Sequence, residues 1–163
     1  MLGEEISSIV ERRSQSHSLI QELVTTRNDM LALFSRLAGF KPFLEPDEGT
    51  RDILQEFCET LVDYTLQAHL NLYRHIEEKQ EKRQKVLQLA EQIYPQILNT
   101  TEIISNFNDI YEEINDQLDS SHLEENLSKL GEALAVRIEL EDQLIAVLTN
   151  KIPAMESKSG LHS

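Results

Sequence analysis

Glycine and proline are scarce in this chain, and their scarcity restricts the fold class. Only 5 glycines and 4 prolines occur in 163 residues, and tryptophan is absent. A strand-and-turn protein needs turn residues about every 8–12 positions, so these counts exclude a β-rich fold and favour helices. The single cysteine, Cys58, has no second cysteine for an internal disulfide. Its place on an apolar helical stripe predicts a small buried side chain.

Long apolar runs are also missing. No stretch approaches the roughly 18 residues that a membrane-spanning helix requires. The first residues, MLGEEISSIVERR, carry charges where a secretion signal has its apolar segment. We therefore expect a cytoplasmic protein that does not contact a membrane.

Basic residues are few relative to acidic ones. The chain has 15 Lys and Arg against 29 Asp and Glu, which gives a formal net charge of -14. Residues 99–148 hold 12 of the acidic side chains and only 2 basic ones. Direct binding to nucleic acid requires clustered Lys and Arg that neutralise phosphates. The charge therefore excludes that function and favours a basic protein surface as the partner.

Apolar residues recur at three- and four-residue spacing along most of the chain, which predicts an all-α fold. Prolines predict a loop over 40–49, because proline lacks the N–H that a helix interior needs. We predict an antiparallel four-helix-type bundle with one additional short helix before Pro95. Pro95 itself either kinks one long helix or begins a new helix at its first turn. The predicted long helices cover residues 4–38, 50–78, 95–118 and 122–150, and the short helix covers 86–94. We expect one domain over 1–150 and a disordered C-terminal tail over 151–163, where the residues are small, polar and unpatterned.

Several polar side chains fall on the apolar faces of these predicted helices. Isolated charges are costly to bury, so their positions predict a paired, hydrogen-bonded arrangement. The predicted internal polar network contains Arg27, His69, Asn108, Arg137 and Glu141. One interpretation is a structural network that fixes helix register, and the other is a polar cavity that holds a small molecule or a metal. No histidine follows a glutamate by three residues, as di-iron bundles require. Catalytic motifs are absent as well, so we expect no metal, no other cofactor and no enzymatic activity.

The predicted second helix carries leucines among acids on the side opposite its apolar stripe. At about 100° per residue, Glu59, Asp63, Leu66 and Leu70 lie about 120–180° from Leu54. Either another helix covers this flank, or the flank binds a partner through apolar anchors combined with acidic groups.

Two helical motifs resemble the Rsd/AlgQ family of bacterial anti-sigma regulators. The first is Phe57-Cys58-Glu59-Thr60-Leu61-Val62-Asp63-Tyr64, followed by Ala68-His69 and Tyr73. The second is Gly131-Glu132-Ala133-Leu134, followed by Arg137 and Leu140-Glu141-Asp142-Gln143-Leu144-Ile145. The resemblance spans roughly residues 8–148. It departs from the family at Leu70, where a phenylalanine is common.

The resemblance implies a cytoplasmic helical bundle that binds region four of the housekeeping sigma factor. Such a protein competes with core RNA polymerase and with promoter -35 DNA, and it lowers housekeeping transcription in stationary phase. We expect it to act as a monomer in the complex. The sigma-binding residues implied are Glu59, Asp63, Leu66, Leu70 and Tyr73. Two alternatives stay open: a signalling adaptor that binds HPr or a (p)ppGpp enzyme, and a small-molecule or metal-binding helical bundle.

Overall fold

All secondary structure that the computed structural model describes is helical, which confirms the predicted all-α class. The structure describes the backbone of residues 2–41, 43, 48–74, 76, 83–112 and 121–149, with side chains from residue 17 onward. The predicted tail over 151–163 lies outside the described residues. The elements in chain order are α1 (Leu2–Ala38), α2 (Glu48–Ala68), a π-helical turn η1 (His69–Tyr73), α4 (Gln84–Tyr111) and α5 (Leu123–Leu148).

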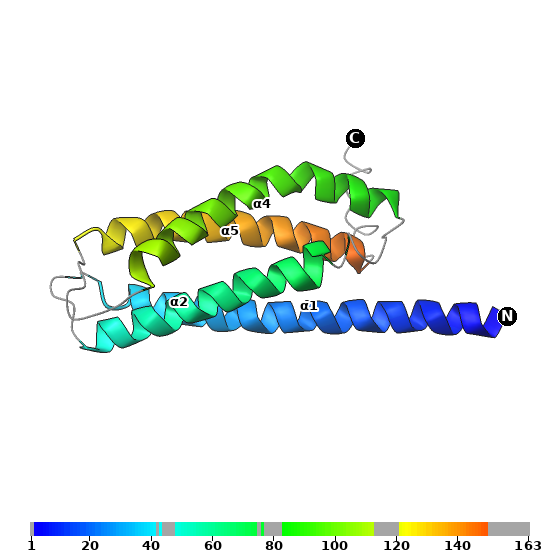
Figure 1. Ribbon diagram of the computed structural model, residues 1–163, viewed down its shortest axis with the longest axis horizontal. Helices are drawn as coiled ribbons and strands as arrows, with labels where there is room; N and C mark the ends of the chain where they lie inside the picture. Colours follow the sequence, from blue (N-terminus) through cyan, green and yellow to red (C-terminus); the bar gives the residue numbers. More distant parts are fainter. Residues whose placement is uncertain are drawn as a thin grey trace, which may run out of the picture.

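The four long helices form two packed pairs, and the two helices of each pair run antiparallel. Figure 1 shows α1 beside α2 and α4 beside α5, with the direction of the chain reversing at each step. The N-terminal part of α1 extends past the other helices. This arrangement is the predicted four-helix-type bundle, in which neighbours in sequence are neighbours in space because the connections are short.

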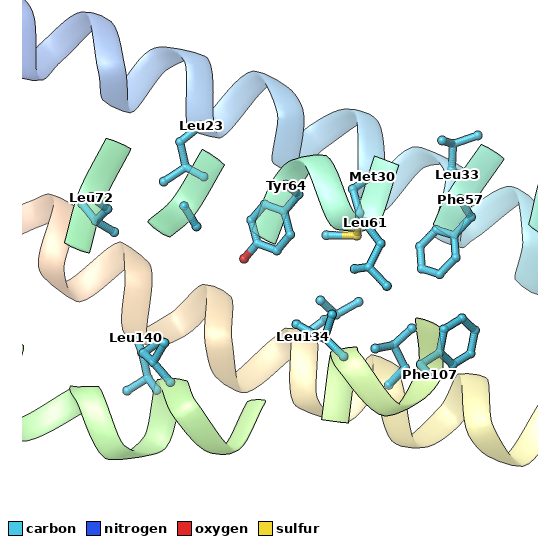
Figure 2. Packing of buried hydrophobic residues seen from close by; sticks show 14 of the residues in the cluster. Leu23, Met30, Leu33, Phe57, Leu61, Tyr64, Leu72, Phe107, Leu134 and Leu140 are labelled. Carbon is cyan, nitrogen blue, oxygen red and sulfur yellow. The ribbon is translucent and has the colours of Figure 1, made fainter. Parts of the chain in front are cut away.

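Apolar side chains from all four helices meet along the axis of the bundle (Figure 2). Leu23 and Met30 of α1, Leu61 of α2 and Leu134 of α5 are almost completely buried. Burial of one such side chain contributes about 1.5–3 kcal/mol. At one end of the core, aromatic rings join three helices, because Phe57 packs edge-on against both Phe34, at 5.8 Å, and Phe107, at 5.9 Å between centroids. The mutual burial of the four apolar faces therefore holds the helices together.

Of the two predicted roles of Pro95, the structure shows the kink: no separate short helix ends before it. A single helix, α4, runs through Pro95 from Gln84 to Tyr111, and Figure 1 shows it as one bent helix. Proline removes one hydrogen bond and crowds the carbonyl four residues before it, which bends a helix without having to end it. Ile93 and Ile97 are both buried in the core, so packing on either side of Pro95 keeps the two halves in one helix.

A candidate protein-binding face and a buried ionic cluster

The centre of the bundle contains an ion pair that is closed off from solvent. Arg137 and Glu141 lie one turn apart on α5 and retain 2% and 0% of their accessible surface. The Nε of Arg137 donates to Oε2 of Glu141 at 3.2 Å. Removing two charges from water is expensive and is repaid only when the remaining polar atoms find partners. The neighbouring helices therefore have to provide those partners.

Helices α2 and α4 supply three hydroxyl groups to this pair. The hydroxyl of Tyr64 donates to Oε1 of Glu141 at 2.6 Å. On the other side, Nη1 of Arg137 donates to the hydroxyl oxygens of Thr100, at 3.1 Å, and Thr101, at 2.8 Å. Both threonines direct their own donors to the carbonyl of Ile97, which leaves their oxygens free to accept. The guanidinium carbon of Arg137 also lies 5.7 Å from the centroid of the Tyr64 ring.

A second arginine, Arg27, connects α1 to the acidic side chains of α5. Nη1 of Arg27 lies 2.9 Å from Oδ1 of Asp142 and 3.6 Å from Oε1 of Glu141. We name Arg27, Tyr64, Thr100, Thr101, Arg137 and Glu141 the buried ionic cluster. Hydrogen bonds join α2, α4 and α5 in this cluster, and the ion pairs of Arg27 add α1. Such contacts restrict the rotation and register of the helices in a way that apolar packing alone does not.

Burial shifts the pKa of the ionisable groups in this cluster. It raises the pKa of Glu141, whereas the charges of Arg137 and Arg27 and the hydrogen bond from Tyr64 favour the ionised carboxylate. Burial, together with the charge of Glu141, also raises the pKa of Tyr64. The phenol therefore keeps its proton and remains a donor to Glu141 throughout the physiological pH range.

Three of the five residues predicted for an internal polar network belong to this cluster: Arg27, Arg137 and Glu141. His69 does not, because its side chain is exposed. Asn108 is buried on α4, but its Oδ1 has no hydrogen-bond partner among the described groups. It therefore lies outside the cluster's hydrogen bonds.

The prediction missed Tyr64, Thr100 and Thr101. Tyr64 is fully buried among apolar side chains, and its position on α2 has the spacing of an ordinary core residue. The threonines lie near the apolar stripe of α4, where their hydroxyls can bond within their own helix. Only the placement of Arg137 beside the two threonines, and of Glu141 beside Tyr64, shows that these three hydroxyls belong to the cluster.

The outward side of α2 presents the apolar-acidic surface that its periodicity predicts. Glu59 and Asp63 are exposed, and Leu66 and Leu70 keep 55% and 40% of their accessible surface. We name these four residues the α2 outer face. The described helices leave it open, so a partner, rather than another part of the described bundle, is free to cover it.

A groove of about 640 Å³ runs beside this face, between α1 and α2. Three carboxylates line it, those of Asp29, Glu56 and Asp63, and no lysine or arginine is among its lining residues. Leu66 and Leu70 border the same groove. The combination of apolar anchors and uncompensated acidic groups complements a basic surface with apolar side chains of its own.

Tyr73, which the resemblance implies as a sigma-binding residue, does not lie on the α2 outer face. In an unbroken α-helix it lies about 100° from Leu54, at the edge of the buried stripe. The π turn η1 contains one extra residue, so Tyr73 takes the position that α periodicity gives to Leu72, on the stripe itself. Its ring is buried and packs edge-on against Tyr94 at 6.4 Å between centroids.

The described part of the chain shows no other class of site. No group of three His, Cys, Asp or Glu side chains within it is placed to hold a metal ion. None of its helices is both long and apolar enough to cross a membrane. Burial raises the pKa of the Cys58 thiol to about 12, so this buried cysteine is unreactive at neutral pH.

These features define a helical bundle with a buried ionic cluster and an exposed apolar-acidic face. The chain belongs to the Rsd/AlgQ family, whose description is "Regulator of RNA polymerase sigma(70) subunit, Rsd/AlgQ" and whose sequence profile matches residues 1–149. The family is thus one of transcription regulators.

Relatives of similar length support this membership. A protein of Enterobacter sp. (strain 638), named Regulator of sigma D, is 34% identical over 153 residues, which are 92% of each chain. Its namesake in Yersinia pestis is 34% identical over 143 residues, 86% of this chain and 85% of the relative. The Yersinia enterocolitica protein of the same name is 32% identical over 143 residues, 86% of each chain. No solved structure was found to match the chain.

Proposed function

We propose that this protein is an anti-sigma factor whose α2 outer face binds region four of the housekeeping sigma factor. The observation that carries the proposal is the exposure of Leu66 and Leu70 beside Asp63, at the edge of a groove lined by three carboxylates. Membership of a family of sigma(70) regulators supports the choice of partner. The printed names of the relatives, Regulator of sigma D, agree with it.

The chemistry of both surfaces accounts for the proposed competition. Region four is a helix-turn-helix domain that reads the -35 element, so its surface carries basic groups that contact phosphates. The acidic groove and Asp63 attract those groups, and Leu66 and Leu70 supply apolar burial that DNA does not offer. Bound as a monomer, the protein thereby excludes promoter -35 DNA and core RNA polymerase from region four. In the cytoplasm of stationary-phase cells, this competition lowers housekeeping transcription.

A titration of the purified protein with sigma region four tests this proposal. Asp63→Ala and Leu70→Ala each remove about 1–2 kcal/mol of binding free energy, a loss of roughly tenfold in affinity. Matched controls are Glu91→Ala and Leu98→Ala, an exposed acid and an exposed leucine on α4, and these leave the affinity unchanged. The affinity also falls as the salt concentration rises, because exposed charges are screened.

Two outcomes of this titration contradict the proposal. Unchanged affinity in both α2 variants excludes this face as the binding site. Absence of any binding to region four, together with binding to HPr, assigns the protein to signalling adaptors instead. A companion assay with labelled -35 DNA on region four separates competition from simple binding, because competition releases the DNA as the protein is added.

A further inference from the structure

A second groove lies on the other helix pair, between α4 and α5. It has a volume of about 600 Å³, and Ile103, Phe107, Ile110, Ala133 and Val136 supply its apolar lining. Phe107 forms a buried floor, whereas Ile103, Ile110 and Val136 keep 40%, 58% and 45% of their accessible surface. We name it the α4–α5 groove. Three large apolar side chains exposed in one hollow are unusual for a surface that stays in contact with water.

This groove is separate from the one beside the α2 outer face. Its lining residues come from α4 and α5 only, whereas the other groove is lined from α1, α2 and the adjoining turn η1. On α4, Ile103 and Ile110 lie about 100–120° around the helix from Ile104, which is at the centre of the buried stripe. The groove therefore faces away from the α1–α2 pair, and an occupant of one groove leaves the other open.

Acidic side chains border the α4–α5 groove on the side of α5. Glu125, Glu132 and Glu139 repeat every seven residues, so they form one exposed stripe along that helix. Glu132 itself lines the groove. Lys129 is the one basic residue in the lining. Its Nζ lies 3.3 Å from Oε1 of Glu125, so the carboxylate partly neutralises the lysine.

On the side of α4, two more acids approach the same groove. Glu102 and Asp109 are exposed and lie four and three residues from Asn106, another lining residue. Side chains at these spacings are neighbours on a helix surface. The groove therefore combines an apolar floor with an acidic edge along α5, and two further exposed acids lie on the outward side of α4.

We propose that the α4–α5 groove is a second docking surface, which takes a basic amphipathic helix of a protein partner. Ile103 and Ile110 are two helical turns apart, a spacing that matches apolar side chains at positions i and i+7 of an incoming helix. The acidic side chains select Lys and Arg on the flanks of that helix. With a partner on the α2 outer face as well, the protein holds two partners at once.

The test uses a synthetic 18-residue peptide with one stripe of leucines and with Lys and Arg at the remaining positions. Its binding to the full-length protein is followed by fluorescence anisotropy. A double variant, Ile110→Ser with Val136→Ser, loses at least tenfold in affinity. The matched variant, Leu66→Ser with Leu70→Ser, removes two exposed leucines of the α2 outer face, which can also attract a basic amphipathic peptide, and it loses less affinity than the variant of the α4–α5 groove. A peptide with Glu in place of every Lys and Arg does not bind.

Circular dichroism first establishes that both double variants retain wild-type helicity, which we expect because all four side chains are exposed. Three results overturn the proposal: no binding of the basic peptide, equal loss in both double variants, or loss only in the α2 variant. Sedimentation supplies a fourth, because a wild-type dimer that the Ile110 and Val136 substitutions abolish assigns the groove to a second copy of this chain.

A parallel titration with sigma region four keeps this inference distinct from the proposed function. Region four binds the variant with Ile110→Ser and Val136→Ser as tightly as it binds wild type. Saturating region four leaves unchanged the part of the peptide binding that this variant loses. Competition between region four and the peptide binding that depends on Ile110 and Val136 contradicts a second surface. Peptide binding in the α4–α5 groove without any binding of region four supports the second surface and refutes only the proposed function.

Discussion

The buried ionic cluster and the α2 outer face both place charges on amphipathic helices, but the surroundings of those charges differ. Glu141 contacts Arg137, Arg27 and Tyr64 in a site without solvent. Asp63 lies exposed at the edge of a groove whose other charged lining groups are also acidic. In the cluster the protein itself provides the complement to each charge. On the α2 outer face that complement has to come from a partner.

Substitutions in these two regions are therefore expected to have different effects. A change within the cluster removes contacts between helices and is expected to act on folding. A change on the α2 outer face removes no contact of the core, so its effect is expected in binding alone. Four predictions test this separation: all four measure stability, and those for Arg137 and Leu70 also measure binding.

The largest effect is expected for Arg137→Met. The substitution leaves the carboxylate of Glu141 buried without its main partner, which costs about 3–5 kcal/mol. Urea unfolding measures the loss, and Arg36→Met, at an exposed position of α1, changes the stability little. The folded fraction of Arg137→Met still binds sigma region four with wild-type affinity. Stability equal to that of Arg36→Met refutes a structural role for the ion pair.

A smaller loss of stability is expected for Tyr64→Phe. This change keeps the buried ring but removes the hydrogen bond to Glu141, and a bond to a charged group contributes about 1.5–3 kcal/mol. Tyr94→Phe is the matched control, because the side chain of Tyr94 is 42% exposed. Equal unfolding midpoints in the two variants contradict the account of Tyr64 as a member of the cluster.

The stability of the protein also depends on pH through Glu141. Burial raises the pKa of this group above its ordinary value of 4.5, so the folded state binds the proton more tightly than the unfolded chain does. The contribution of Glu141 is therefore fully present below pH 4.5 and is lost as the pH rises through the folded pKa, by at most about 1.4 kcal/mol per pH unit. As the pH rises, the free energy of unfolding of wild type therefore falls relative to that of Glu141→Gln. Glu139→Gln, at an exposed site, gives a curve parallel to wild type.

The smallest effect is expected for Leu70→Phe on the α2 outer face. A larger anchor buries more apolar area against a partner, and a gain of about 1 kcal/mol raises the affinity for region four roughly fivefold. Because Leu70 is exposed, the unfolding midpoint stays unchanged. A change in stability without a change in affinity contradicts the assignment of this side chain to a binding surface.

Helical periodicity was sufficient to predict the bundle, the exposure of Glu59, Asp63, Leu66 and Leu70, and the burial of Arg137 with Glu141. These positions follow directly from an angle around a regular helix. Periodicity failed wherever the helix departs from regular geometry. The π turn η1 moved Tyr73 onto the buried stripe, and α4 continues through Pro95 because tertiary packing outweighs the local cost of proline.

The remaining members of the cluster could not be predicted from one helix at a time. Thr100 and Thr101 bind Arg137 across the boundary between α4 and α5. Tyr64 reaches Glu141 from α2, 77 residues away in sequence. Such contacts depend on the relative rotation of two helices, which the pattern of one helix does not specify.

An NMR titration of the protein with sigma region four tests the central claim most directly, because it locates the bound surface without any substitution. If the α2 outer face is the binding site, amide signals of Glu59–Leu70, and of α1 residues beside the groove such as Asp29, shift or broaden first. Signals of Arg137 and Glu141 in the cluster change little. Perturbations confined to α4 and α5, with α2 unaffected, would contradict the account.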